Sequence, residues 1–164
     1  MLSLSRRAGG VAALLVAVSL ALAGCSLIRS GDARRDESGR PTESSKADVL
    51  KLRVGDCISG KTEGVVGDVT VIPCGQEHEL EAFAATKMRD ATYPGADAVS
   101  EEADDFCFGE FTAFIGKSYE ESTLEYRYFQ PTALSWRSGD REILCLVGKP
   151  EGAQSKGTLR GSRK

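Results

Sequence analysis

The sequence predicts an α+β domain in which one helix packs on an antiparallel sheet of about five strands and two disulfides staple the fold. Three observations support this class. Short alternating or β-branched segments recur along the chain, one long segment has apolar residues at helical spacing, and four of the five cysteines lie within the predicted domain. A period of two residues is typical of strands, whereas spacings of three and four are typical of a helix.

Five segments are predicted to be strands. In the first, Leu50, Leu52 and Val54 alternate with Lys51 and Arg53, which indicates a half-buried strand that ends before the Gly55-Asp56 turn. The other four segments show alternation or β-branched residues, and they cover residues 65–72, 79–87, 124–128 and 143–147.

The clearest predicted element is a helix over residues 97–115. Asp97 is its expected N-cap, and Gly116 is its expected C-terminal cap. Its apolar face comprises Val99, Ala103, Phe106, Cys107, Phe111, Phe114 and Ile115. Cys107 on this face would point toward the sheet, where Cys145 could meet it.

Four cysteines in an exported domain of this size indicate two disulfides. Cys57, Cys74, Cys107 and Cys145 allow three pairings. We favour Cys57–Cys74 with Cys107–Cys145, since this pairing staples each half of the chain locally. Loops of these lengths would contribute roughly 3 to 4 kcal/mol each in the chain-entropy model.

The first 24 residues have the features of an export signal. Arg6 and Arg7 form a short basic region, and the stretch Val11 to Ala23 carries no charge. This stretch is shorter than the roughly 20 apolar residues of a membrane-spanning helix, but it fits the apolar region of a signal peptide.

The sequence Leu22-Ala23-Gly24-Cys25 resembles the lipobox of bacterial lipoproteins. This resemblance implies cleavage before Cys25 and attachment of a diacylglycerol to its sulfur, which would hold the protein at the extracytoplasmic face of the cell membrane. Two acyl chains are enough for stable anchoring. The alternative is an ordinary secretory signal that a cysteine happens to follow.

The mature chain is predicted to have three parts: Cys25 with a flexible tether over 25–47, a folded domain over 48–148, and a flexible basic tail over 149–164. A minor alternative for the tail is attraction to anionic headgroups. Without Arg6 and Arg7, the 24 acidic residues outnumber the basic ones by five. This acidic balance argues against a nucleic-acid partner.

Several short motifs occur in order between residues 54 and 145. They are Val54-Gly55-Asp56-Cys57, Pro73-Cys74-Gly75-Gln76-Glu77-His78 with Glu81 and Phe83, Tyr93-Pro94-Gly95 before Cys107, and Pro131, Trp136, Gly139-Asp140-Arg141 and Cys145. Together they resemble the septum formation domain of actinobacterial membrane proteins and lipoproteins, although Glu77 stands where that family is expected to have proline. The resemblance implies an extracytoplasmic module associated by name with cell division, with no known catalytic activity, substrate or cofactor.

His78 is the first candidate for a functional residue, because it is the only histidine of the chain. Cys74 and the carboxylates of Glu77, Glu79 and Glu81 surround it in sequence, so a metal site or a hydrolytic centre is one hypothesis. No Gly-x-Ser-x-Gly motif accompanies it, and the thiols should pair in an oxidising compartment. The favoured interpretation is a histidine that bonds to backbone or to a carboxylate.

Trp136, Asp140 and Arg141 form the second candidate group. Asp140 can accept from turn amides and Arg141 can pair with a carboxylate, which indicates a tight turn with a packed tryptophan. The alternative is a recognition patch of Trp136 with Tyr126 and Tyr128, since aromatic residues and arginine dominate binding hot spots.

These observations predict a non-catalytic envelope lipoprotein without a cofactor or a bound metal. Its partners would be the membrane, through the lipid, and a protein or cell-wall ligand in envelope or division processes. The candidate binding residues are His78, Glu81, Trp136, Asp140 and Arg141. The alternative function is a metal-binding or hydrolytic domain centred on His78.

Overall fold

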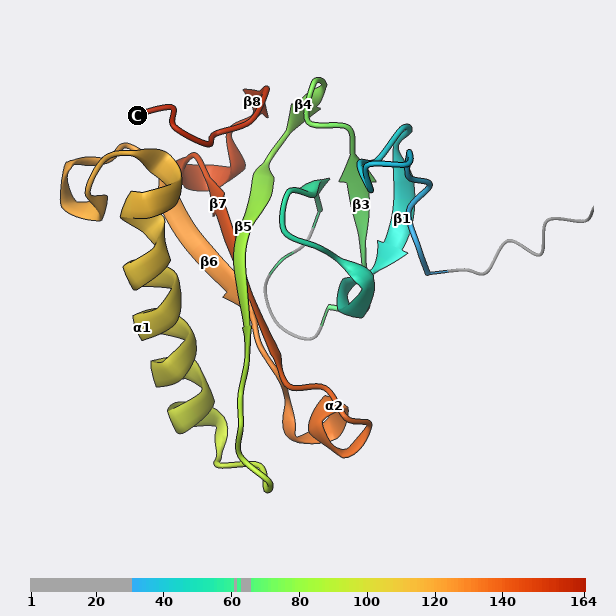
Figure 1. The fold of residues 1–164 in the computed structure, drawn as a ribbon, viewed down its shortest axis with the longest axis vertical. Coiled ribbons are helices and arrows are strands. Elements are labelled where there is room, and N and C mark those ends of the chain that lie inside the picture. Colours follow the sequence, from blue (N-terminus) through green and yellow to red (C-terminus); the bar gives the residue numbers. More distant parts are fainter. Residues whose placement is uncertain (1–30, 61, 63–65) are drawn as a thin grey trace, which may run out of the picture.

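The computed structural model describes residues 31–60, 62 and 66–164. The predicted signal peptide and Cys25 lie outside these residues. The main sheet is antiparallel, with six strands in the order β1-β3-β2-β5-β7-β6 (Figure 1). These strands are β1 (Ser45–Asp48), β2 (Cys57–Ser59), β3 (Asp68–Ile72), β5 (Leu80–Lys87), β6 (Glu125–Phe129) and β7 (Glu142–Gly148).

A two-stranded sheet and several helical segments complete the fold. The small sheet pairs β4 (Glu77–His78) with β8 (Ser155–Lys156). The helical segments are α1 (Ala96–Ile115), α2 (Ala133–Arg137) and the 3-10 turns η1 (Val49–Lys51), η2 (Tyr119–Glu121) and η3 (Pro150–Gly152). Among the described residues, no helix is long and apolar enough to span a bilayer. The predicted α+β class is confirmed.

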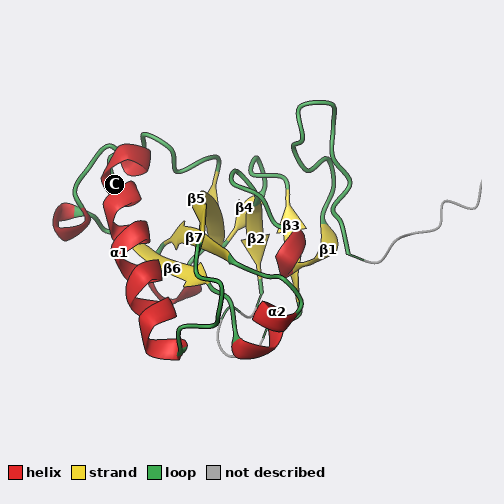
Figure 2. Ribbon diagram, turned by 60° about the horizontal axis from the view of Figure 1, so that its bottom comes forward, coloured by secondary structure: helices red, strands yellow, loops and turns green. Residues whose placement is uncertain are grey.

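Helix α1 covers one half of the sheet. It contacts β5, β6 and β7, and it lies at the end of the molecule away from β1 (Figure 2). Gly116 ends the helix in a left-handed conformation, and its N–H donates to the carbonyl of Thr112 at 2.9 Å, as predicted. The predicted N-cap Asp97 is wrong: it lies in the first turn of the helix, the N-cap is Gly95 two positions earlier, and no side chain caps this end.

The two faces of the sheet bury separate clusters. Along β7, Ile143, Cys145 and Val147 belong to the cluster under α1, which also contains Phe83 and Phe111. The intervening Leu144 and Leu146 belong to a second cluster on the opposite face, with Ile58, Val71, Leu80 and Ala82. This alternation follows the two-residue period of a strand that is covered on both sides.

Both predicted disulfides are confirmed. Cys57–Cys74 joins β2 to the turn after β3, and Cys107–Cys145 joins α1 to β7. The first lies in the N-terminal half of the sheet, and the second fixes the helix to the C-terminal half.

The strand predicted over residues 50–54 is wrong. Residues Val49–Lys51 form η1, because the side chain of Asp48 accepts from the N–H of Leu50 at 2.9 Å and turns the chain. Leu52 is buried, but Leu50 and Val54 are 55% and 45% exposed. The sheet instead uses Cys57–Ser59, a strand that the sequence pattern did not reveal.

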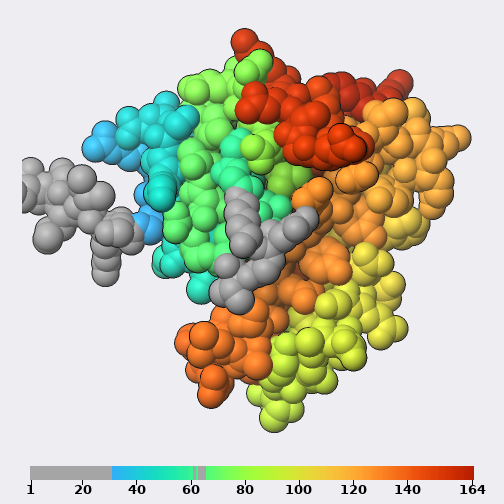
Figure 3. All heavy atoms as spheres, turned by 180° about the vertical axis from the view of Figure 1, so that it is seen from behind, coloured from blue at the N-terminus to red at the C-terminus, as the bar shows by residue number. Residues whose placement is uncertain are grey.

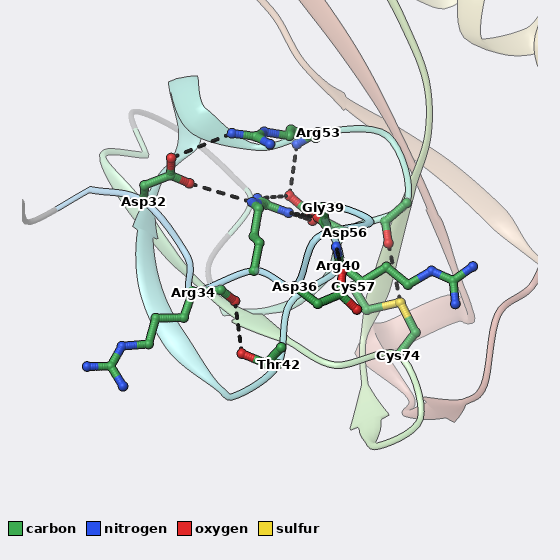
Figure 4. Close-up of polar contacts among 12 residues, drawn as sticks. Asp32, Arg34, Asp36, Gly39, Arg40, Thr42, Arg53, Asp56, Cys57 and Cys74 are labelled. Atoms are coloured by element: carbon green, nitrogen blue, oxygen red, sulfur yellow. Dashed lines mark hydrogen bonds and ion pairs between the residues drawn. A yellow bond between two sulfur atoms is a disulfide. The ribbon is translucent and has the colours of Figure 1, made fainter.

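Residues 31–47 are not the flexible tether that composition suggested. Residues 45–48 form the edge strand β1, and the preceding loop is tied to the domain by Arg35 (Figure 4). Nη1 and Nη2 of Arg35 donate to the two carboxylate oxygens of Asp56 at 2.6 and 2.8 Å, and Asp56 is 1% exposed. This bidentate ion pair fixes the position of the polar segment.

Residues 149–164 are likewise not a flexible tail. Ser155 and Lys156 form β8, and Leu159 is 1% exposed within the cluster under α1. The backbone N–H groups of Gly161 and Arg163 donate to the last carbonyls of α1, at Phe114 and Ile115. The helix end therefore finds in this segment the partners that its terminal carbonyls require.

Candidate functional site

His78 lies in the interior of the domain. It is fully buried on β4, and its Nδ1 is 2.9 Å from the carbonyl oxygen of Gln76. A carbonyl can only accept, so Nδ1 is the donor of this hydrogen bond. Nε2 has no hydrogen-bond partner, and neither has the buried hydroxyl of Ser155, its cross-strand neighbour on β8. This arrangement agrees with the predicted backbone bond of His78.

Glu81 is buried beside the Cys57–Cys74 disulfide and holds the C-terminal segment. Its Oε1 accepts from the hydroxyl of Thr158 at 2.7 Å, and its Oε2 accepts from the backbone N–H of Leu159 at 2.6 Å. Within the described chain, Cys57, Cys74 and Glu81 are the residues that bring potential metal ligands within 4.8 Å of one another. Both sulfurs are in the disulfide, and both carboxylate oxygens already accept hydrogen bonds, so this group acts as a structural clamp.

Trp136, Asp140 and Arg141 come together at α2. Thr132 and Ser135 form a reciprocal capping box that starts this short helix. The guanidinium carbon of Arg141 lies 3.7 Å from the centre of the Trp136 ring, and Nη1 donates to the carbonyls of Trp136 and Asp140. Trp136 is 5% exposed and its ring also packs on Tyr93, so the predicted tight turn with a packed tryptophan is confirmed.

The alternative patch of Trp136 with Tyr126 and Tyr128 is not formed. Tyr126 packs under α1, where its hydroxyl donates to Asp104 at 2.8 Å and its ring lies near Tyr119. Burial, and then the hydrogen bond to Asp104, raise the pKa of Tyr126 above its ordinary value. Tyr126 therefore attaches the helix to the sheet.

A broad concave surface lies next to α2, on the sheet face opposite α1. This groove has a volume of about 840 Å³. Its apolar lining comprises Val49, Leu50, Val66, Phe129, Leu134 and Leu144, and its polar end comprises Lys87, Asp140, Arg141 and Glu142. In Figure 3, the orange segment that contains α2 projects below the green and cyan half of the sheet.

Two walls of the groove present leucines to solvent. Leu134 on α2 is 68% exposed and Leu50 on η1 is 55% exposed, although both are large and apolar. The described residues contain two other exposed large hydrophobic side chains, Val54 and Phe108. Apolar side chains gathered around one hollow indicate a contact surface rather than chance exposure.

Charged side chains lie at the polar end of the groove. Burial raises the pKa of Glu142 above its ordinary value, with Lys87 acting against this shift and Asp140 adding to it. Asp140 uses one oxygen to accept from the backbone N–H of Glu142 at 3.0 Å. This end of the groove can therefore offer both a cation and carboxylates to a ligand.

Sequence reasoning found part of this site. Asp140 and Arg141 line the groove, and the Trp136 ring packs against Arg141. His78 and Glu81 are both buried away from the groove, and Glu81 belongs to the clamp. Leu50 and Leu134 were missed, because exposure depends on the turns that carry them. The Thr132-x-x-Ser135 spacing was the one local signal that a helix starts before Leu134.

Comparison with known proteins identifies the family. No curated protein and no solved structure matches the chain. The septum formation family matches residues 24–163, which include every element described above. The motif order, the two disulfides and this match agree, and the chain belongs to the septum formation family.

Proposed function

We propose that this protein is a non-catalytic envelope lipoprotein, anchored by acyl chains at Cys25, that binds a polypeptide segment in the groove beside α2. The observation that carries the proposal is the apolar groove itself, with Leu50 and Leu134 exposed on its walls. The groove places apolar side chains beside hydroxyl, amide and charged groups, and this mixture suits a peptide segment, which offers apolar side chains together with backbone hydrogen-bonding groups. The role belongs to envelope or division processes, in keeping with the family.

The anchor is supported by the sequence before the domain and by the oxidised cysteines within it. Leu22-Ala23-Gly24-Cys25 follows an apolar stretch, and the four remaining cysteines form two disulfides. Disulfides persist in oxidising compartments outside the cytosol. Export and lipid attachment account for both features together.

The alternative function, a metal-binding or hydrolytic site at His78, has one favourable observation. The unpartnered Nε2 of His78 lies on the strand opposite the unpartnered hydroxyl of Ser155. Both residues are buried, with exposures of 0% and 4%, so a substrate has no path to them without movement of β8. The groove requires no such movement, and we therefore favour binding.

Site-specific photo-cross-linking in cells tests the groove. A photoreactive phenylalanine analogue at Leu134 should yield a discrete adduct, which mass spectrometry would identify as protein or as cell-wall material. The same analogue at Phe108, which is exposed on α1 at the other side of the sheet, is the matched control. A Leu134 adduct that Cys25→Ala abolishes supports the proposal. Identical adducts from both positions, or none from Leu134, would contradict it.

A further inference from the structure

The point at which the chain enters the domain is fixed at β1. Gly31 bridges to Ala47, and its carbonyl accepts from the backbone N–H of Asp48 at 3.2 Å. β1 is an edge strand of the sheet, at the opposite edge from β6. Five strand spacings separate these edges, which corresponds to about 24 Å.

The covalent chain limits how far this point can lie from the lipid. Cys25 precedes Gly31 by six positions, and an extended chain spans at most about 22 Å over that length. With acyl chains on Cys25, which is the function proposed above, the β1 edge must lie near the bilayer surface. The 22-residue tether expected from composition would have imposed no such orientation.

The turn that follows β1 carries exposed apolar and basic side chains. We call residues Val49–Lys51 with their neighbour Arg53 the Leu50 tip. Leu50 is 55% exposed, Lys51 is exposed, and the side chain of Arg53 is 57% exposed. Figure 1 shows this turn at the end of β1.

The acidic side chains near this tip each have a partner. Asp48 accepts from the backbone N–H of Leu50, Asp68 pairs with Lys46 at 3.4 Å, and Asp32 pairs with Arg53 at 3.6 Å. Beside the exposed Leu50, Lys51 is the basic side chain of the tip that has no ion pair among the described residues. With the lipid anchor already holding the domain near the bilayer, one basic residue contributes about 1 kcal/mol at an anionic surface, and an exposed aliphatic side chain gains from entering the headgroup boundary.

We infer that the Leu50 tip docks on the membrane. Leu50 enters the boundary between headgroups and acyl chains, and Lys51 faces the lipid phosphates. Because Leu50 borders the groove, docking gives this wall to the lipid, leaves the wall that carries Leu134 to the peptide, and places the groove at the bilayer surface. Its ligand is then a segment that runs close to the membrane.

Tryptophan quenching in vesicles tests this inference on the lipidated full-length protein. Leu50→Trp and the matched control Phe108→Trp are reconstituted in phosphatidylcholine and phosphatidylglycerol vesicles whose upper acyl chains carry bromine. The buried Trp136 contributes the same background to both variants. We expect Leu50→Trp to be quenched about twofold or more relative to Phe108→Trp, because bromine quenches only groups at the bilayer boundary.

The outcomes separate docking from the anchor. Equal quenching of the two variants in protein that is acylated by mass and floats with the vesicles would overturn docking alone. Protein that is neither acylated nor floating would overturn the anchor and the docking with it. In the Leu50→Trp background, Lys51→Glu should lower quenching with phosphatidylglycerol present and not in phosphatidylcholine alone. Unchanged quenching would overturn the role of Lys51.

Discussion

The two ends of the described chain look alike in sequence and differ in how the fold holds them. Residues 31–47 and 149–164 are both polar and rich in small or charged residues. Each segment is nevertheless held by hydrogen bonds to a buried carboxylate, which is Asp56 for residues 31–47 and Glu81 for residues 149–164. Low apolar content predicts disorder only when no buried group provides a partner.

The chemistry of the two fastenings is different. Arg35 and Asp56 are a charged pair with side-chain exposures of 8% and 2%, so each ion depends on the other. The hydrogen bond to Asp56 is the main cause that raises the pKa of Arg35. Glu81 instead receives two uncharged donors, and Leu159 beside them adds an apolar anchor. Residues 31–47 are thus fastened mainly by charged groups, including the Asp32–Arg53 pair, and residues 149–164 by uncharged donors and apolar burial.

Both fastenings converge on one turn. Asp56 precedes Cys57, which lies opposite Glu81 in the pairing of β2 with β5. The N–H of Ala82 donates to the carbonyl of Asp56 at 2.8 Å, and the N–H of Gly157 donates to that of Cys74 at 2.7 Å. The Cys57–Cys74 disulfide therefore lies between the contacts that hold residues 31–47 and those that hold residues 149–164.

Breaking the ion pair should have the largest effect. Arg35→Met leaves Asp56 buried without its cation, which we expect to lower the free energy of unfolding by about 3–5 kcal/mol. Urea unfolding with the disulfides intact measures this loss, and hydrogen exchange should rise in residues 31–44. Arg34→Met is the matched control, since its side chain is 71% exposed and should cost less than about 1 kcal/mol. Similar losses in the two variants would refute a dominant role for the pair.

Loosening the other end should have an intermediate effect. Glu81→Gln keeps the shape of the side chain but removes one of its two acceptors, so we expect a loss of about 1.5–3 kcal/mol. Faster hydrogen exchange should appear at residues 157–163 and leave residues 31–44 protected. Glu77→Gln, at an exposed position of β4, should stay within about 0.5 kcal/mol of the parent protein. If hydrogen exchange rose equally in residues 31–44 and 157–163, the two segments would not be held independently of each other.

Replacing a third carboxylate, Glu142, should have the smallest effect on stability. The raised pKa of Glu142 means that the folded protein binds its proton more tightly than the unfolded chain does. Stability should therefore fall as the pH rises from the ordinary glutamate pKa through the raised value. Glu142→Gln removes this fall, so its Tm relative to the parent should increase across that pH range. The exposed Glu125→Gln should run parallel to the parent, and a parallel Glu142→Gln curve would disprove the assignment.

Sequence patterns predicted the half of the fold that depends on repeated apolar residues. The helix with Gly116 as its cap, three strands of the sheet's C-terminal half and both disulfides are confirmed. The alternation of Leu50, Leu52 and Val54 misled, because the backbone N–H of Leu50 donates to the carboxylate of Asp48 and the chain turns there. Single long-range contacts such as Arg35 with Asp56 leave no periodic signal, so neither chain end could be predicted.

The same limit applies to the site. Asp140 and Arg141 were found because a turn motif marks them, and both line the groove. No sequence motif identifies Leu134 as exposed, since a leucine that follows a capping threonine can lie in a core as well as on a surface. Three-dimensional placement was needed to show that Leu50 and Leu134, far apart in the chain, border one hollow.

The clamp at Glu81 has a consequence for biogenesis. Its two donors come from Thr158 and Leu159, so strand β5 keeps an unsatisfied buried carboxylate until those residues have been synthesised. A polypeptide threaded through a translocon must stay unfolded in transit. In a chain exported as proposed above, the interior around Glu81 cannot close until Thr158 and Leu159 have crossed the membrane, so this part of the domain folds late.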